Sequence, residues 1–151
     1  MKQPLLFLLM SVILCPAMAQ NSKNNHPDAI VGTYRVAHAG QQSKVRVFKD
    51  KNGEYFAQCI WLRDSLDPKT GKLVTDTKNP DKSLRDTPCN RIIIIRHMKY
   101  NSKKKHWDSG KIYDPTRGIS ANCTCEFLPD GRLKVRGSVL GIGESIYWKP
   151  L

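Results

Sequence analysis

The feature that most constrains the fold is a series of eight short segments with the composition of β-strands; some alternate apolar and polar residues, while 54–62 and 91–98 are largely apolar on both faces. In residues 132–139, for example, three basic residues alternate with the apolar ones. Turn residues such as Asp50-Lys51-Asn52-Gly53 and Pro129-Asp130-Gly131 separate the segments. No segment has the periodicity of an amphipathic helix. The sequence therefore predicts an all-β chain with strands near 30–36, 43–49, 54–62, 91–98, 106–114, 119–127, 132–139 and 144–149.

Short turns between most of these strands favour an antiparallel meander. Closure into a barrel removes the exposed sheet edges, so an eight-stranded barrel is the predicted fold and a two-sheet sandwich is the alternative. An eight-stranded barrel is filled by side chains or holds one small ligand. Residues 63–89 are the one long interruption, rich in charges and proline dipeptides, and this loop is a candidate lid or binding segment.

The N-terminus predicts export. Residues 1–19 combine Lys2, a short apolar run and small residues before Gln20, as in a secretory signal peptide cleaved near Ala19. Cys15 offers the alternative of a lipoprotein, although Leu14 before it is bulkier than usual there. We expect residues 20–29 to be a disordered leader, residues 30–151 to be a single domain, and the mature protein to be secreted or periplasmic.

The chain is strongly basic, with 25 Lys and Arg against 13 Asp and Glu. This charge attracts anionic partners such as lipid head groups, and nucleic acid is not expected for an exported protein. Five cations face outward on two of the predicted strands and would form a basic stripe if those strands were neighbours. They are Lys44, Arg46, Arg132, Lys134 and Arg136. The other interpretation is an ordinary solvated face.

Cysteine usage fits an oxidising compartment. Four cysteines remain after cleavage, and they permit two disulfides in three pairings. Cys123 and Cys125 share a face of their strand and do not easily bond to each other, so we expect a bridge from Cys89 to one of them. The fourth is Cys59. A weaker alternative is a soft-metal site in which Cys123 and Cys125 bind the ion together with Cys89, His97 or His106. No metal or other cofactor is predicted.

Several motifs together resemble a bacterial family, Domain of Unknown Function 2147. They are Gly32-Thr33-Tyr34, the stretch from Asp76 to Asp81, the run from Trp107 to Gly118, Leu133-x-Val135-Arg136-Gly137 and Trp148. Tyr34 stands where the family usually has Trp, and Asn90 where it usually has Gly. The resemblance covers residues 30–149 and implies a secreted, lipocalin-like barrel, without an established activity.

Two groups of residues are candidate ligand contacts, each with a structural alternative. Asp76, Asn79 and Asp81 offer oxygen atoms to calcium or a ligand, but such Asx-Pro segments commonly form turns. Arg136, which is part of the resemblance, is a further candidate. Five aromatic residues are candidates to line a cavity, with core packing as the alternative. They are Tyr34, Trp61, Trp107, Tyr113 and Trp148.

These residues favour a ligand-binding protein over an enzyme. No nucleophile elbow, paired-carboxylate motif or phosphate loop is present, and Cys89 with a histidine is the one candidate nucleophile. We therefore predict a barrel that binds a small hydrophobic or amphipathic molecule. The competing hypothesis is a solid barrel whose loops and basic face contact a protein or an anionic envelope surface.

Overall fold

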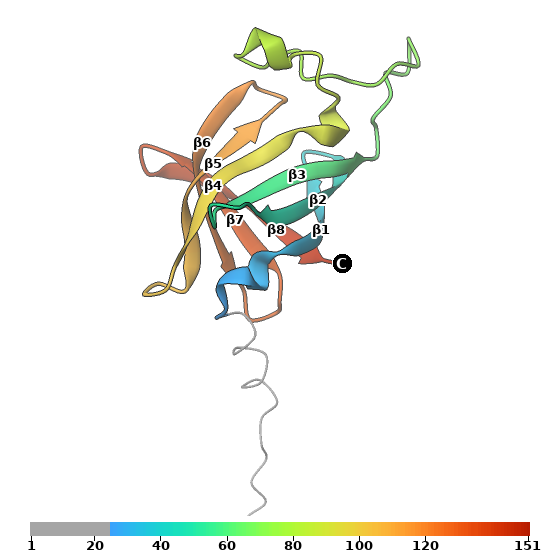
Figure 1. The fold of residues 1–151 in the computed structure, drawn as a ribbon. Helices are drawn as coiled ribbons and strands as arrows, with labels where there is room; N and C mark the ends of the chain where they lie inside the picture. The colour runs from blue at the N-terminus through green and yellow to red at the C-terminus, as the bar shows by residue number, and fades with distance from the viewer. Residues whose placement is uncertain (1–24) are drawn as a thin grey trace, which may run out of the picture.

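The computed structural model describes residues 25–151, which form a closed antiparallel barrel of eight strands in chain order (Figure 1). The predicted fold class is confirmed. The expected signal peptide and the first residues of the expected leader lie outside the described range. The strands are β1 (Gly32–His38), β2 (Gln41–Lys49), β3 (Tyr55–Leu62), β4 (Ile93–Asn101), β5 (His106–Asp114), β6 (Ile119–Phe127), β7 (Leu133–Val139) and β8 (Ile142–Pro150).

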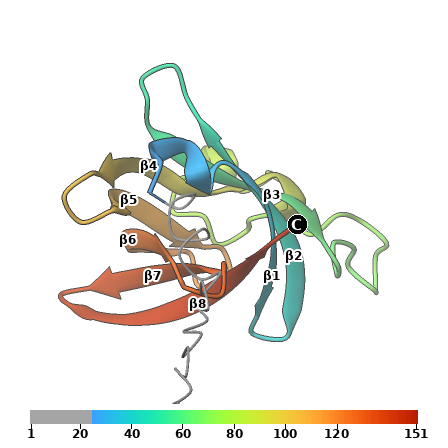
Figure 2. The same cartoon turned by 90° about the horizontal axis from the view of Figure 1, so that it is seen from below.

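The seam that closes the barrel is short. β1 pairs with β8 only through Tyr34↔Pro150 and Arg35↔Lys149. β7 and β8, by contrast, pair along their whole length. The β1–β2 and β7–β8 hairpins therefore diverge beyond the seam, as the view from below shows (Figure 2).

Large side chains fill the barrel at one end. Trp107 and Trp148 are completely buried, and Tyr34 packs against Trp148 with ring centroids 5.9 Å apart. Interdigitated aromatic and aliphatic side chains of this kind form a solid core. Its other members are Ile30, Val36, Val45, Val47, Tyr55, Ala57, Ile95, Met98, Cys123, Cys125, Leu133 and Val135.

A short 3₁₀ helix, η1 (Pro27–Ile30), seals this end of the barrel. Proline stands in its first turn, where the missing N–H costs nothing. Trp107 Nε1 donates to the Pro27 carbonyl at 2.9 Å, and the Tyr34 hydroxyl donates to the Ile30 carbonyl at 2.7 Å. Ordered structure thus begins before Ile30, so the prediction of a disordered leader over residues 20–29 does not hold for residues 27–29. Contacts with the core, which no local pattern reveals, order this segment.

A β-bulge in β3 decides where Trp61 lies. Val45 pairs with Cys59, but the preceding Lys44 pairs with Trp61, so Ile60 is an extra residue. One extra residue reverses the alternation of side chains beyond it. Trp61 therefore lies on the outer face, although simple alternation places it on the inner face with Cys59.

A second bulge, in β5, moves Tyr113 to the outer face in the same way. Trp107 pairs with Cys125 and Gly110 pairs with Cys123, so β5 spans three residues where β6 spans two. The side chain of Trp107 points inward, whereas Tyr113, six residues later, points outward. Without the bulge both would share one face.

The long connection between β3 and β4 is ordered by its own contacts. It contains η2 (Lys82–Leu84) and η3 (Cys89–Arg91), and its backbone forms the isolated bridges Leu66↔Leu73 and Thr75↔Pro88. In Figure 1 it lies at the end of the barrel opposite η1.

Candidate functional site

The inner face of β8 changes from buried to exposed along its length. Trp148 is completely buried, and Ile146, two residues earlier on the same face, is partly buried against the core. Ile142, at the start of the strand, is 84% exposed. Because alternate residues share a face, Ile142 lies on the inward side at the end opposite η1.

The two strands beside β8 show the same change. On β7 the inner face runs from the buried Val135 to Val139, which is 54% exposed. On β6 it runs from the buried Cys123 to Ile119, which is 51% exposed. Val139 and Ile142 are direct cross-strand partners. We call Ile119, Val139 and Ile142 the rim cluster: three large, exposed aliphatic side chains on the inner face of adjacent strands at the barrel end opposite η1.

The surface below the rim cluster is closely packed. A Cβ at Gly137 would lie 3.2 Å from Ile112 Cγ2 and 3.7 Å from the Ala121 Cβ, so side chains of neighbouring strands already cover this position. Glu144, the cross-strand partner of Gly137, brings an exposed carboxyl group to the same face. Trp148 Nε1 is buried at the sealed end, without a hydrogen-bond partner among residues 25–151. The end opposite η1 thus combines exposed aliphatic side chains with the carboxyl group of Glu144, and small-molecule sites likewise combine apolar and polar groups.

The five predicted aromatic residues do not line one cavity. Tyr34, Trp107 and Trp148 are core residues, as the alternative of core packing proposed. The bulges place Trp61 and Tyr113 outside the barrel. Sequence reasoning missed the rim cluster instead. Its signal is the run from Val139 to Ile142, which places three aliphatic residues at a hairpin turn where polar residues are usual.

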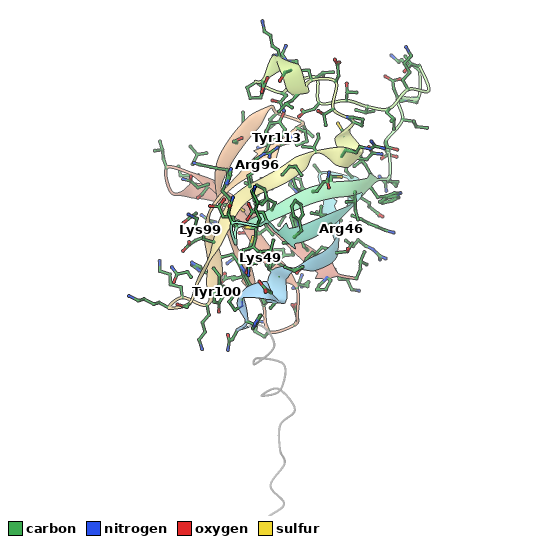
Figure 3. The ribbon with its side chains drawn as sticks, in the orientation of Figure 1. Arg46, Lys49, Arg96, Lys99, Tyr100 and Tyr113 are labelled. Atoms are coloured by element: carbon green, nitrogen blue, oxygen red, sulfur yellow. The ribbon has the colours of Figure 1, made fainter. Side chains whose placement is uncertain are left out.

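Asp76 and Asn79 meet Tyr113 in a buried contact that fastens the long loop to the barrel. The Tyr113 hydroxyl donates to Asp76 Oδ1 at 2.7 Å, and Asn79 Nδ2 donates to Asp76 Oδ2 at 2.7 Å. Asp76 is only 1% exposed. Burial, together with the hydrogen bond to Asp76, raises the pKa of Tyr113. This geometry supports the turn interpretation of these residues (Figure 3, where Tyr113 is labelled beneath the loop).

Two further contacts complete this junction. The Lys78 ammonium donates to the Thr116 carbonyl at 2.7 Å, and a Cβ at Gly118 would overlap the Lys78 carbonyl. Gly118 also has φ +70°, which glycine adopts without strain. Asp81 caps η2 by accepting from the Ser83 amide at 2.9 Å, so its carboxyl group serves local structure. Two of the stretches that carry the family resemblance, Asp76–Asp81 and Trp107–Gly118, are therefore in contact in the folded protein.

All four cysteines in the described range are free thiols, so the expected bridge from Cys89 is absent from the structure. Cys123 and Cys125 point into the barrel, where Cys125 Sγ lies 3.4 Å from Met98 Sδ. Cys89 is in η3, outside the barrel. Burial, with the nearby Asp76 and Cys59, raises the pKa of Cys89 to about 11.

We expect Cys89 to react slowly with iodoacetamide in the folded protein. A pKa of about 11 leaves few thiolates at pH 8, so alkylation should be on the order of 100-fold slower than after denaturation. Peptide mass spectrometry at successive times measures both rates. Alkylation of folded Cys89 as fast as in the denatured chain would contradict the burial seen here.

The predicted basic stripe does not form, because β1 and β8 lie between β2 and β7. On β7, Lys134 pairs with Glu126 at 2.8 Å, and Arg132, just before the strand, pairs with Asp130 at 2.7 Å. The Arg136 guanidinium donates to the Gly141 and Gly143 carbonyls at 3.4 Å, and these contacts stabilise the β7–β8 turn.

Other features of residues 25–151 give weaker evidence for a ligand or metal site. A depression of about 500 Å³ beside η1 is bordered by Val31, Tyr34, Phe127 and Leu151. No group of three His, Cys, Asp or Glu side chains is placed to hold a metal ion in this part of the chain. Nor does a helix there have the length and apolar character needed to cross a membrane.

A family model described as an uncharacterized protein conserved in bacteria, DUF2147, matches residues 32–149. This chain belongs to the DUF2147 family. No curated protein matches it. A solved structure with a similar barrel is that of HP1028 from Helicobacter pylori, described as belonging to the lipocalin family. It shares 22% identity with a TM-score of 0.65, over 81% of this chain and 82% of that one. The similarity shows that this chain has the fold of a lipocalin-like barrel.

Proposed function

We propose that this DUF2147 protein binds a small hydrophobic or amphipathic molecule at the end of its barrel opposite η1. The observation that carries the proposal is the rim cluster. Water-exposed aliphatic side chains on the inner face of three adjacent strands are costly to hydrate and are released from water when an apolar ligand covers them. At the other end, η1 covers the inner side chains of Tyr34 and Trp107, which donate hydrogen bonds to its carbonyl groups.

A polar group near the rim cluster favours an amphipathic ligand. Glu144 offers an acceptor to a hydroxyl or cationic head group. A ligand with an aliphatic body and one polar group would use both kinds of surface. From the N-terminal sequence we also propose that the protein meets this ligand outside the cytoplasm, after cleavage near Ala19.

Native mass spectrometry of the protein from its own source tests the presence of a ligand. We expect the mass of residues 20–151 plus a small molecule that is lost on denaturation. Recovery of the bare polypeptide alone, in repeated preparations, would argue against a resident ligand.

A binding titration tests the position of the site. With cis-parinaric acid as the fluorescent probe, replacing both Val139 and Ile142 by Asp should weaken binding at least 10-fold, because each aliphatic contact is worth roughly 1.5–3 kcal/mol when buried. Val31→Asp, at the depression beside η1, is the matched control and should bind the probe normally. Loss of binding in the control alone would move the site to that depression, and no binding by the unaltered protein would overturn the proposal.

A further inference from the structure

We propose that one side of the barrel docks on a bilayer that contains anionic phospholipid. The docking face consists of a row of three cations with an adjacent tryptophan, and of a protruding loop hairpin that exposes two leucines. Its members are Arg35, Lys44, Lys149, Trp61, Leu66 and Leu73. This face is separate from the rim cluster and does not depend on it.

The cations form a row that only barrel closure creates. Lys149 on β8 is the cross-strand partner of Arg35 on β1, and Arg35 is the partner of Lys44 on β2. None of the three has an acidic partner within 4 Å in the described part of the chain. Like charges directly opposite each other destabilise a sheet, so this row lowers stability unless an anion covers it. Arg46, labelled in Figure 3, adds another outward cation on β2.

Trp61 continues the row on β3. It pairs with Lys44, whose ammonium lies 5.5 Å from the centre of the indole ring. Trp61 is 42% exposed, whereas Trp107 and Trp148 are completely buried. An exposed tryptophan beside lysine is typical of side chains at a membrane–water interface, where the ring and the ammonium occupy the head-group region.

The hairpin of residues 65–74 extends from the end of β3, to the right of the barrel in Figure 1. Leu66 and Leu73 form a bridge at its base and are 56% and 45% exposed. Asp67 Oδ1 accepts from the Lys69 and Thr70 amides at 2.7 and 3.1 Å, which fixes the turn. The two leucines are therefore held in solvent by an ordered hairpin.

Arg63 ties the hairpin to the cationic row. Its backbone N–H donates to the Gln42 carbonyl at 2.9 Å, and its guanidinium donates to the Gly40 carbonyl at 2.7 Å. Both acceptors lie at the tip of the β1–β2 hairpin, which carries Arg35 and Lys44. Exposed leucines near Lys69 and Lys72, next to the unpaired cations of the row, match the chemistry of a phospholipid surface with its anionic phosphates above an apolar layer; Arg63 itself pairs with Asp64 at 3.2 Å.

Vesicle sedimentation tests the cationic row. The protein beginning at Gln20 should bind vesicles of phosphatidylcholine with phosphatidylglycerol, and not pure phosphatidylcholine. Replacing Arg35, Lys44 and Lys149 together by Gln should weaken binding on the order of 100-fold, since each cation near a charged surface contributes roughly a fivefold factor. Replacing Lys103, Lys104 and Lys105 by Gln removes the same charge from the β4–β5 turn and is the matched control.

The control also decides between specific and general attraction. Equal losses in both triple variants would mean that only net charge matters, and a larger loss in the control would place the contact at the β4–β5 turn; either result overturns the proposed face. Failure of the unaltered protein to bind anionic vesicles would overturn it too. Circular dichroism checks that each variant is folded.

Tryptophan fluorescence tests the apolar part. Because Trp61 is the exposed tryptophan of the three, its emission should shift to the blue on anionic vesicles and Trp61→Phe should remove the shift. Leu66→Ser with Leu73→Ser should weaken binding at least 10-fold without changing the salt dependence. An unchanged spectrum in the presence of bound vesicles would show that this face points away from the lipid.

Discussion

Replacing Trp107 by alanine is expected to lower the free energy of unfolding by about 4 kcal/mol, the middle of the range for a large aromatic residue removed from a core. The indole is completely buried and packs against Tyr100 and Phe127, with ring centroids 5.2 and 5.8 Å away. It also donates the hydrogen bond that holds η1 over the sealed end. The substitution therefore creates a cavity and releases the segment that closes the barrel.

Urea unfolding followed by far-ultraviolet circular dichroism measures this loss. Trp61→Ala is the matched control, because the same side chain on the outer face should cost about 1 kcal/mol or less. Equal losses in the two variants would contradict the placement of Trp107 inside and Trp61 outside. A loss below 1 kcal/mol for Trp107→Ala would show that the core is far less tightly packed than described.

Replacing Asp76 by alanine is expected to release the long loop while the barrel stays folded. The carboxyl group accepts from both Tyr113 and Asn79, and its removal leaves two donors without partners in a buried junction. The cost should be about 2–3 kcal/mol, so amide hydrogens in residues 75–89 should exchange on the order of 100-fold faster.

Hydrogen exchange with mass spectrometry measures this opening peptide by peptide. Asp86→Ala is a suitable control because Asp86 is exposed in the same loop. Tyr113→Phe combined with Asp76→Ala completes a double-mutant cycle, and the two effects should be strongly non-additive if the hydroxyl acts through Asp76. Faster exchange throughout the barrel strands would instead mean that the junction supports the whole fold.

The chemistry of the candidate site was less accessible from the sequence than the fold. Asp76, Tyr113 and Gly118 were recognised as motif residues, but their mutual contact joins segments far apart in the chain. The rim cluster was missed because an aliphatic residue at the end of a strand looks the same whether the barrel closes over it or not. Only the positions of neighbouring strands decide whether Val139 and Ile142 are covered.

Local patterns determined the strand segments, the turns between them and the antiparallel order, because alternation and turn conformation depend on residues close in sequence. Tertiary structure alone decided which face of the sheet is occupied by the side chains that follow a bulge. One-residue bulges in β3 and β5 reversed the alternation for Trp61 and Tyr113. It also decided which cations meet. Lys149 and Arg35 lie more than a hundred residues apart and become neighbours only when β8 closes on β1.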